Sequence, residues 1–217
     1  MLRLPAFRAI NSENDYLSES EMKRLFIAVD LAIAVVERLA MAQAELQESV
    51  SQDSGDQVDL RLVAPENIHI TLKFLGDQPL ELMPMVEKAL EKLTEPLFPF
   101  EVECARLGAF PRAARPRIIW AGLDEESEEV LGLLQKALER DLEQLGVERE
   151  SRPFHPHVTL GRVKSRRVAP DFEEILKPYG NVSFGKSFIK DLVLFESHLE
   201  ARGPRYEVVR RFSLGRS

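Results

Sequence analysis

The sequence predicts an α+β protein with two pseudo-symmetric lobes of mostly antiparallel sheet, helices packed outside and an active-site cleft between the lobes. Short apolar runs rich in branched and aromatic residues alternate with longer Ala-, Leu- and Glu-rich runs of helical pattern. The order of these elements in the first half of the chain, including one His-x-Thr string, returns in the second half. At 217 residues the chain is long enough to bury the core of one such bilobal domain.

In the first half, apolar runs indicate strands and the longer amphipathic runs indicate helices. Asp30 is placed to cap the first helix, residues 51–57 form a polar loop, and Gly76 with Asp77 ends the strand before them. The expected strands cover residues 24–29, 60–63, 67–75 and 98–107. The expected helices cover residues 31–50 and 80–93.

The second half repeats this order. The strand expected at residues 117–122 resembles that at 24–29, and Asp124 matches Asp30 as a helix cap. A long amphipathic helix over residues 125–145 ends before Gly146, a residue suited to a helix C-terminus. The second His-x-Thr strand follows, and further strands are expected at residues 182–184, 188–195 and 205–214.

Composition narrows the class of protein. The net charge of −7 argues against binding along a whole nucleic-acid backbone, although local patches can still be basic. The single cysteine, Cys104, excludes an internal disulfide and fits a cytoplasmic protein. No apolar run reaches the roughly 18 residues of a membrane span. We expect a flexible N-terminal arm over residues 1–21, a single bilobal domain over residues 22–217, no membrane contact, no obligate protein partner and a monomer.

Two short strings carry the chemistry, His69-Ile-Thr71-Leu and His157-Val-Thr159-Leu. In a strand, residues i and i+2 point to the same side, so each string presents an imidazole beside a hydroxyl. The two strings follow their lobes' opening strands at similar distances, since 45 residues separate Arg24 from His69 and 40 separate Arg117 from His157. Two such pairs facing each other offer acid–base attack on a phosphate ester without a metal.

Four strings resemble the two-histidine phosphoesterase superfamily, and within it the LigT-like RNA 2′,3′-cyclic phosphodiesterases, also called 2′-5′ RNA ligases. The resemblance extends over residues 22–214. The strings are Lys23–Asp30, the ten-residue motif Asn67–Gly76, Pro116–Gly122 and Pro156–Arg162.

The resemblance implies a metal-independent enzyme without a cofactor that opens a terminal 2′,3′-cyclic phosphate of RNA to a 2′-phosphate. It also implies that the reaction can run backward as ATP-independent 2′-5′ ligation. His69 is implied as the proton donor and His157 as the proton acceptor, although pseudo-symmetry makes these roles exchangeable. We expect Thr71 and Thr159 to donate hydrogen bonds to the non-bridging phosphate oxygens.

Phe74 and Arg162 occupy the same offset, five residues after each histidine. The resemblance implies a phosphate contact for Arg162 and a nucleotide-pocket position for Phe74. An odd offset points to the opposite face of a regular strand, so the prediction requires a bulge near Gly161 or the reach of a long side chain.

Several alternatives stay open. The substrate is an RNA 3′ end or, alternatively, a small nucleotide or ADP-ribose-derived metabolite with a cyclic phosphate, and a non-catalytic RNA-end binder is the third reading. His155-Pro-His157 suggests a metal site, but the sequence supplies few further ligands. The role of His155 is undefined. Two acid-free basic runs are either solvated loops or a cradle for an RNA end, namely Arg106, Arg112, Arg115 and Arg117 and then residues 162–167.

Overall fold

The computed structural model describes residues 22–54, 58–165, 170–200 and 203–215, so the expected arm over residues 1–21 lies outside the described part. The strands are β1 (Met22–Asp30), β2 (Val58–Leu62), β3 (His69–Pro79), β4 (Phe100–Phe110), β5 (Ile118–Leu123), β6 (Val158–Ser165), β7 (Ser183–Ile189), β8 (Asp191–Glu200) and β9 (Gly203–Ser213). The α-helices are α1 (Ile33–Ser54), α2 (Met83–Thr94), α3 (Glu125–Glu143) and α4 (Phe172–Leu176). Short 3-10 turns cover residues 65–67, 80–82 and 177–179.

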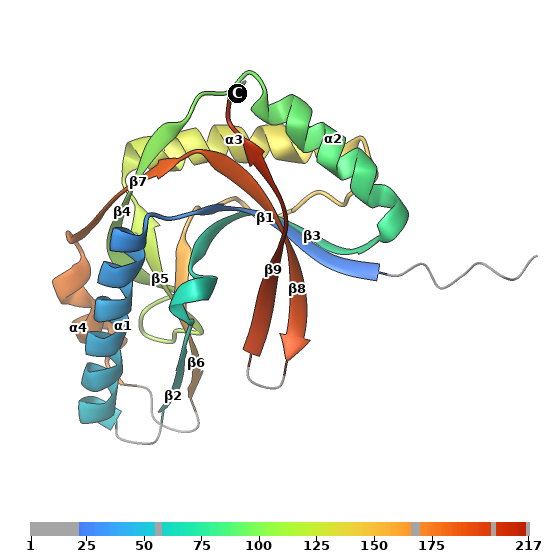
Figure 1. The fold of residues 1–217 in the computed structure, drawn as a ribbon. Coiled ribbons are helices and arrows are strands. Elements are labelled where there is room, and N and C mark those ends of the chain that lie inside the picture. Colours follow the sequence, from blue (N-terminus) through green and yellow to red (C-terminus); the bar gives the residue numbers. More distant parts are fainter. Residues whose placement is uncertain (1–21, 55–57, 166–169, 201–202, 216–217) are drawn as a thin grey trace, which may run out of the picture.

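Within the described residues the strands form one antiparallel, curled sheet, which confirms the predicted fold class (Figure 1). The strand order is β7-β4-β5-β6-β3-β1-β8-β9, and β2 adds to β6. This order is symmetric about the contact between β6 and β3. The two strands that carry the His-x-Thr strings therefore meet at the centre of the sheet, each beside the opening strand of its own half.

The halves are not continuous in sequence. In the first half, β3 and β1 are followed by β8 and β9, which come from the end of the chain. In the second half, β6 and β5 are followed by β4 and β7. The outer strands of both halves are thus recruited from segments that lie outside the repeated β-α-β order.

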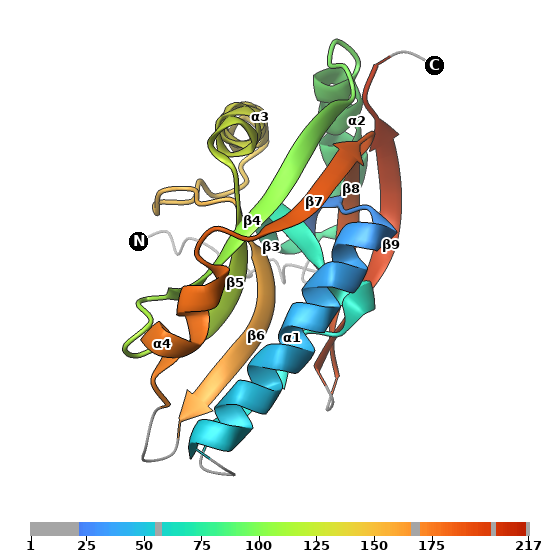
Figure 2. The ribbon, with the colours of Figure 1, turned by 90° about the vertical axis from the view of Figure 1, so that its left-hand side faces the viewer.

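The helices cover one face of the sheet. Ile27 and Val29 of β1 point to that face and join the main core together with Leu39 of α1 and Leu138 of α3. Figure 1 shows α1 and α4 beside one half and α2 beside the other, while α3 contacts β4 of one half and β3 of the other. Figure 2 shows α1 running along β6. Alternate residues of β1, such as Phe26, face the opposite side and form a separate apolar cluster with residues of β8.

Several predicted boundaries were wrong. Helix α1 continues to Ser54 where a loop was expected over residues 51–57, of which 55–57 lie outside the described residues. Strand β3 does not end at Gly76 but extends to Pro79, since it pairs with the first residues of β1. The segment between β6 and β7 contains the short helix α4, for which no prediction was made.

One of the two expected helix caps is present. Asp124 accepts a hydrogen bond from the backbone N–H of Ser127, 3.0 Å away, at the start of α3. Asp30 does not cap α1. It ends β1, and its carboxylate lies 2.6 Å from the guanidinium of Arg211 on β9. At the other end of α3, Gly146 adopts a φ of +84°, a conformation that glycine accommodates without strain.

Candidate active site

The two His-x-Thr strings lie side by side. Ile70 of β3 pairs with Val158 of β6, and both side chains are fully buried in the main core. Because cross-strand partners point to the same side of a sheet, the residues flanking Ile70 and Val158 point to the opposite side. This side, called the histidine face below, carries His69, Thr71, His157 and Thr159. His157 itself directly precedes β6 instead of lying within it.

Two bulges bring Phe74 and Arg162 to the histidine face. In β3 the register shifts after Thr71, so that Thr71 pairs with Ala28 and Phe74 with Phe26, two residues on one side of β1. In β6 the register shifts near Gly161, so that Thr159 pairs with Trp120 and Arg162 with Ile118. The irregularity that strand parity demanded is therefore present at the same place in both strings.

Aromatic rings support His69. Its ring stacks on Phe26 at a centroid distance of 5.1 Å and meets the edge of Tyr206 at 5.3 Å. This burial lowers the pKa of His69 to about 4, against the opposing effects of a backbone hydrogen bond at Asn67 and the charge of Asp30. The ring Nε2 lies 3.0 Å from Thr71 Oγ1. At neutral pH, the imidazole is therefore uncharged in the free protein.

His157 is held by the backbone. Its Nδ1 lies 2.7 Å from the carbonyl oxygen of His155, which can only accept a hydrogen bond. Nδ1 therefore carries the proton, and Nε2 of the neutral ring keeps its lone pair. Phe110 contacts the ring edge-on at 5.1 Å, and burial lowers the pKa of His157. The charge of His157 also lowers the pKa of His69, so the two rings interact across the histidine face.

A buried ion pair anchors the bulge of β3 from the helix side. Lys73, between Thr71 and Phe74, donates to Glu139 of α3 at 2.8 Å and to the carbonyl of Glu148 at 2.9 Å. The side chains of Lys73 and Glu139 are 1% and 5% exposed. Two charges so far from water are stabilised only when they are paired, so this contact fixes the register of β3 where the bulge begins.

A pocket of about 470 Å³ opens beside His69. It lies between the end of β1, the start of α1, the turn at residues 65–67 and strands β8 and β9. Tyr206 lines it. Burial raises the pKa of Tyr206, and the charge of Arg162, which lies within reach of its hydroxyl, opposes this rise. Tyr206 therefore connects this pocket to the part of the histidine face that β6 supplies.

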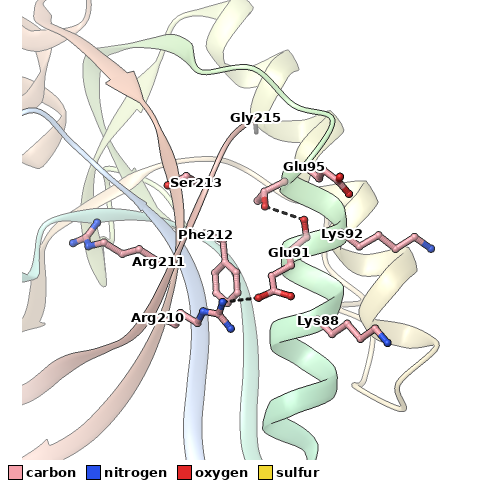
Figure 3. Close-up of a pocket in the computed structure, with 10 residues that line it drawn as sticks. Lys88, Glu91, Lys92, Glu95, Arg210, Arg211, Phe212, Ser213 and Gly215 are labelled. Carbon is pink, nitrogen blue, oxygen red and sulfur yellow. Dashed lines mark hydrogen bonds and ion pairs between the residues drawn. The ribbon is translucent and has the colours of Figure 1, made fainter. Parts of the chain in front are cut away.

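A larger pocket of about 610 Å³ lies elsewhere, between α2 and the end of β9 (Figure 3). Arg210, its central cation, is bound to Glu87 at 2.7 Å and to Glu91 at 2.5 Å. Figure 3 shows Lys88 and Lys92 pointing away from the sheet. The two ion pairs of Arg210 thus attach α2 to β9.

Two further hypotheses from the sequence concern a metal site at His155 and His157 and a basic cradle for an RNA end. Among the described residues, no group of three or more His, Cys, Asp or Glu side chains could hold a metal ion. Arg106 pairs with Glu128 of α3 and donates to the carbonyl of Leu123, so its charge is already paired within the protein. Arg112 and Arg115 are exposed in the loop that follows Phe110, the residue whose ring contacts His157. Residues 166 and 167 of the other basic run lie outside the described part.

Sequence reasoning missed three residues near His69. Asp30, assigned as a cap, pairs with His69 across β1 and β3. Tyr206 and Arg211 of β9 were recognised only as members of a late strand. A regular strand would turn these two residues, five positions apart, to opposite faces, and no local pattern links β9 to a histidine more than 130 residues earlier in the chain. The described helices include none that is long and apolar enough to cross a membrane.

Comparisons with known proteins agree with this geometry. A family model described as the 2′-5′ RNA ligase superfamily matches residues 40–186. A protein of Archaeoglobus fulgidus named RNA 2′,3′-cyclic phosphodiesterase is 36% identical over 189 residues, 87% of this chain and 99% of that protein. A crystal structure of a Thermus thermophilus protein is similar with a TM-score of 0.72 at 29% identity, covering 89% of this chain and 100% of the other. Escherichia coli LigT complexed with 3′-AMP is similar with a TM-score of 0.69 at 25% identity, covering 90% and 100%.

Proposed function

Because the chain belongs to the 2′-5′ RNA ligase superfamily, we propose that it hydrolyses the 2′,3′-cyclic phosphate at the 3′ end of RNA to a 2′-phosphate. One observation carries the proposal. The Ile70–Val158 pairing turns two imidazole–hydroxyl pairs to the same side of adjacent strands. Two imidazoles that can accept and donate protons, together with two hydroxyl donors, are what in-line opening of a cyclic phosphate requires.

In the proposed reaction, His157 Nε2 takes a proton from water, and the water oxygen bonds to phosphorus. The bond from phosphorus to O3′ breaks, and His69 gives its proton to O3′. The product carries a 2′-monophosphate and a 3′-hydroxyl, and one proton returns from His157 to His69 through solvent. In the reverse direction an RNA 5′-hydroxyl replaces water, which would form a 2′-5′ linkage.

The hydrogen bond from His157 Nδ1 to the carbonyl of His155 leaves Nε2 as an acceptor, as a base requires. His69 also has a backbone hydrogen bond, at Asn67, so the order of roles follows the family resemblance. His69 must instead be protonated when it acts. Its lowered pKa keeps the ring neutral in the free protein. The negative charge of a cyclic phosphate beside the ring favours the imidazolium, so substrate binding raises the pKa of His69 and the ring takes its proton from solvent.

Thr71 and Thr159 donate hydrogen bonds to the non-bridging oxygens in this proposal, and Arg162 neutralises their charge. Phe74, which is 67% exposed on the histidine face, provides a surface on which a nucleobase stacks. The two histidines account for both proton transfers, so the proposal includes no metal and no cofactor. We expect a cytoplasmic monomer that acts on RNA ends, with an affinity that falls as salt rises.

The test is incubation of an oligoribonucleotide that ends in a 2′,3′-cyclic phosphate, with EDTA present and the phosphate position of the product determined. We expect a 2′-monophosphate from the wild type. His69→Ala and His157→Ala should each lower kcat/KM by about 10²–10⁴-fold. His155→Ala is the matched control, because it removes an exposed imidazole and retains the carbonyl that holds His157.

The same assay separates the alternatives. Higher kcat/KM for a mononucleotide cyclic phosphate than for the oligonucleotide would favour a small-metabolite enzyme. Binding without any hydrolysis would indicate an RNA-end binder, and loss of activity in EDTA would indicate a metallohydrolase. A 3′-monophosphate product would contradict the assignment of O3′ as the leaving oxygen.

A further inference from the structure

We propose that the buried ion pair of Lys73 and Glu139 positions His157 relative to His69, an inference that rests on the proposed function. The two histidines come from different strands, and the proposed proton transfers require both rings at one phosphorus atom. Lys73 itself does not touch the substrate, because its side chain is 1% exposed and pairs with α3 on the helix side of the sheet. The pair therefore acts on the reaction through the backbone that it holds.

The backbone joins the two histidine strands at one place. Within the described ladders, β3 and β6 pair at Ile70 and Val158 alone. By contrast, β3 pairs with β1 along its whole length, and β6 pairs with β5 over residues 158–162. His157 directly precedes β6 and so lies outside the paired part of that strand. The placement of its ring thus depends on the segment that leads to it.

The ion pair binds this segment at two points. The structure describes residues 144–157, between α3 and β6, as a stretch without helix or strand. Lys73 Nζ donates to the carbonyl oxygen of Glu148 at 2.9 Å, and the backbone N–H of Glu150 donates to Glu139 Oε2 at 3.4 Å. The same carboxylate oxygen lies 2.8 Å from Lys73 Nζ. One buried network thus connects β3, α3 and the approach to β6.

This network fixes the approach more strictly than apolar packing would. Residues 151–153, which follow the two anchored positions, are exposed, and the chain returns to the core at Phe154 and Pro156. Each buried charge needs its partner at hydrogen-bond distance, so the pair tolerates little displacement. Because β1 also holds β3, loss of the pair releases chiefly the approach to His157. A shift of a reacting group by about 1 Å can cost about 10²-fold in rate.

The test replaces both charges at once, so that neither stays buried alone. Lys73→Met/Glu139→Leu keeps similar side-chain volumes, and such replacements of a buried ion pair are often neutral or stabilising. We therefore expect a urea midpoint at or above that of the wild type. For a cyclic-phosphate-ended RNA, kcat should fall at least tenfold while KM stays within threefold, because β1 still holds the substrate-binding residues of β3.

A second readout follows the ring of His157 itself. Its imidazole resonances, assigned by comparison with His157→Ala, sense the ring current of Phe110, which contacts the imidazole edge-on. The double variant should shift these resonances. The matched control is Lys23→Met/Glu196→Leu, which removes an ion pair of 2.6 Å between β1 and β8 and should change neither kcat nor the His157 resonances.

Unchanged kcat or unchanged His157 resonances in the folded double variant overturn the positioning role. A rise in KM without a fall in kcat also overturns it, because the pair would then act on substrate binding. If the first variant does not fold, Lys73→Met/Glu139→Gln replaces it and keeps an acceptor for Gln135. Failure of both to fold assigns the pair to folding and overturns the proposal. A wild type that opens no cyclic-phosphate-ended RNA shows that the proposed function has failed, whereas the His157 resonances still test the placement of the ring.

Discussion

Acidification from pH 7.5 to 4.5 is expected to remove about 2.5 kcal/mol of unfolding free energy through the single ring of His69. Packing against Phe26 and Tyr206 lowers the pKa of this ring from 6.5 to about 4 in the folded protein. In the unfolded chain the ring titrates near 6.5. The unfolded state therefore binds more protons over this window, and stability present above pH 6.5 is lost as the pH falls toward 4.

The assay is urea unfolding at several pH values for the wild type, His69→Gln and Thr71→Val. Both variants keep the acidic groups whose titration also changes stability. The difference between His69→Gln and the wild type therefore measures the contribution of the His69 ring. His69→Gln should lose about 2.5 kcal/mol less than the wild type between pH 7.5 and 4.5. Thr71→Val keeps the imidazole and should follow the wild type. An equally steep loss of stability in His69→Gln and wild type would refute the reasoning.

Three further substitutions test the frame around the histidines. Glu139→Ala leaves the ammonium of Lys73 buried without its carboxylate. This should lower the free energy of unfolding, measured in urea, by about 3–5 kcal/mol. A loss below about 1 kcal/mol would contradict a structural role for the pair. Gly108→Ala places a Cβ 2.3 Å from the ring of Trp120, so it should destabilise by about 1–3 kcal/mol and shift the emission of the only tryptophan. Unchanged emission and melting would show that the ring does not lie over Gly108. Phe74→Ala should raise KM for an RNA substrate with little change in Tm, since the side chain is 67% exposed; a large fall in Tm with unchanged KM would assign Phe74 to the core.

The paired histidines and threonines could be predicted from the sequence, because the direction of a side chain in a strand depends only on its position along that strand. The alternation of apolar and polar residues around His69 and His157 predicts which side chains share a face. The repeat of the same string in two similar contexts predicts two such faces. For Phe74 and Arg162 the odd offset left a bulge near Gly161 or the reach of a long side chain as alternatives, and only the structure shows a bulge in both strands.

The residues that complete the surroundings of His69 required the tertiary structure. Strands β8 and β9 come from the end of the chain and pair beside β1, so that Tyr206 and Arg211 lie next to a ring far away in sequence. Such a pairing depends on which sheet edge is available once the other strands have assembled. Asp30 shows what the sequence could not predict. Its sequence context suits a helix cap, whereas in the structure its carboxylate pairs with Arg211 of β9.

The sequence by itself determined the fold class, the two imidazole–hydroxyl pairs and the helix start at Asp124, because each depends on contacts within a few residues or on periodicity along one element. The tertiary structure decided which strands complete each half of the sheet, how Lys73 and Glu139 are buried together, and where a pocket opens beside His69. These features depend on the free energy of packing surfaces that are distant along the chain. No local pattern encodes that free energy.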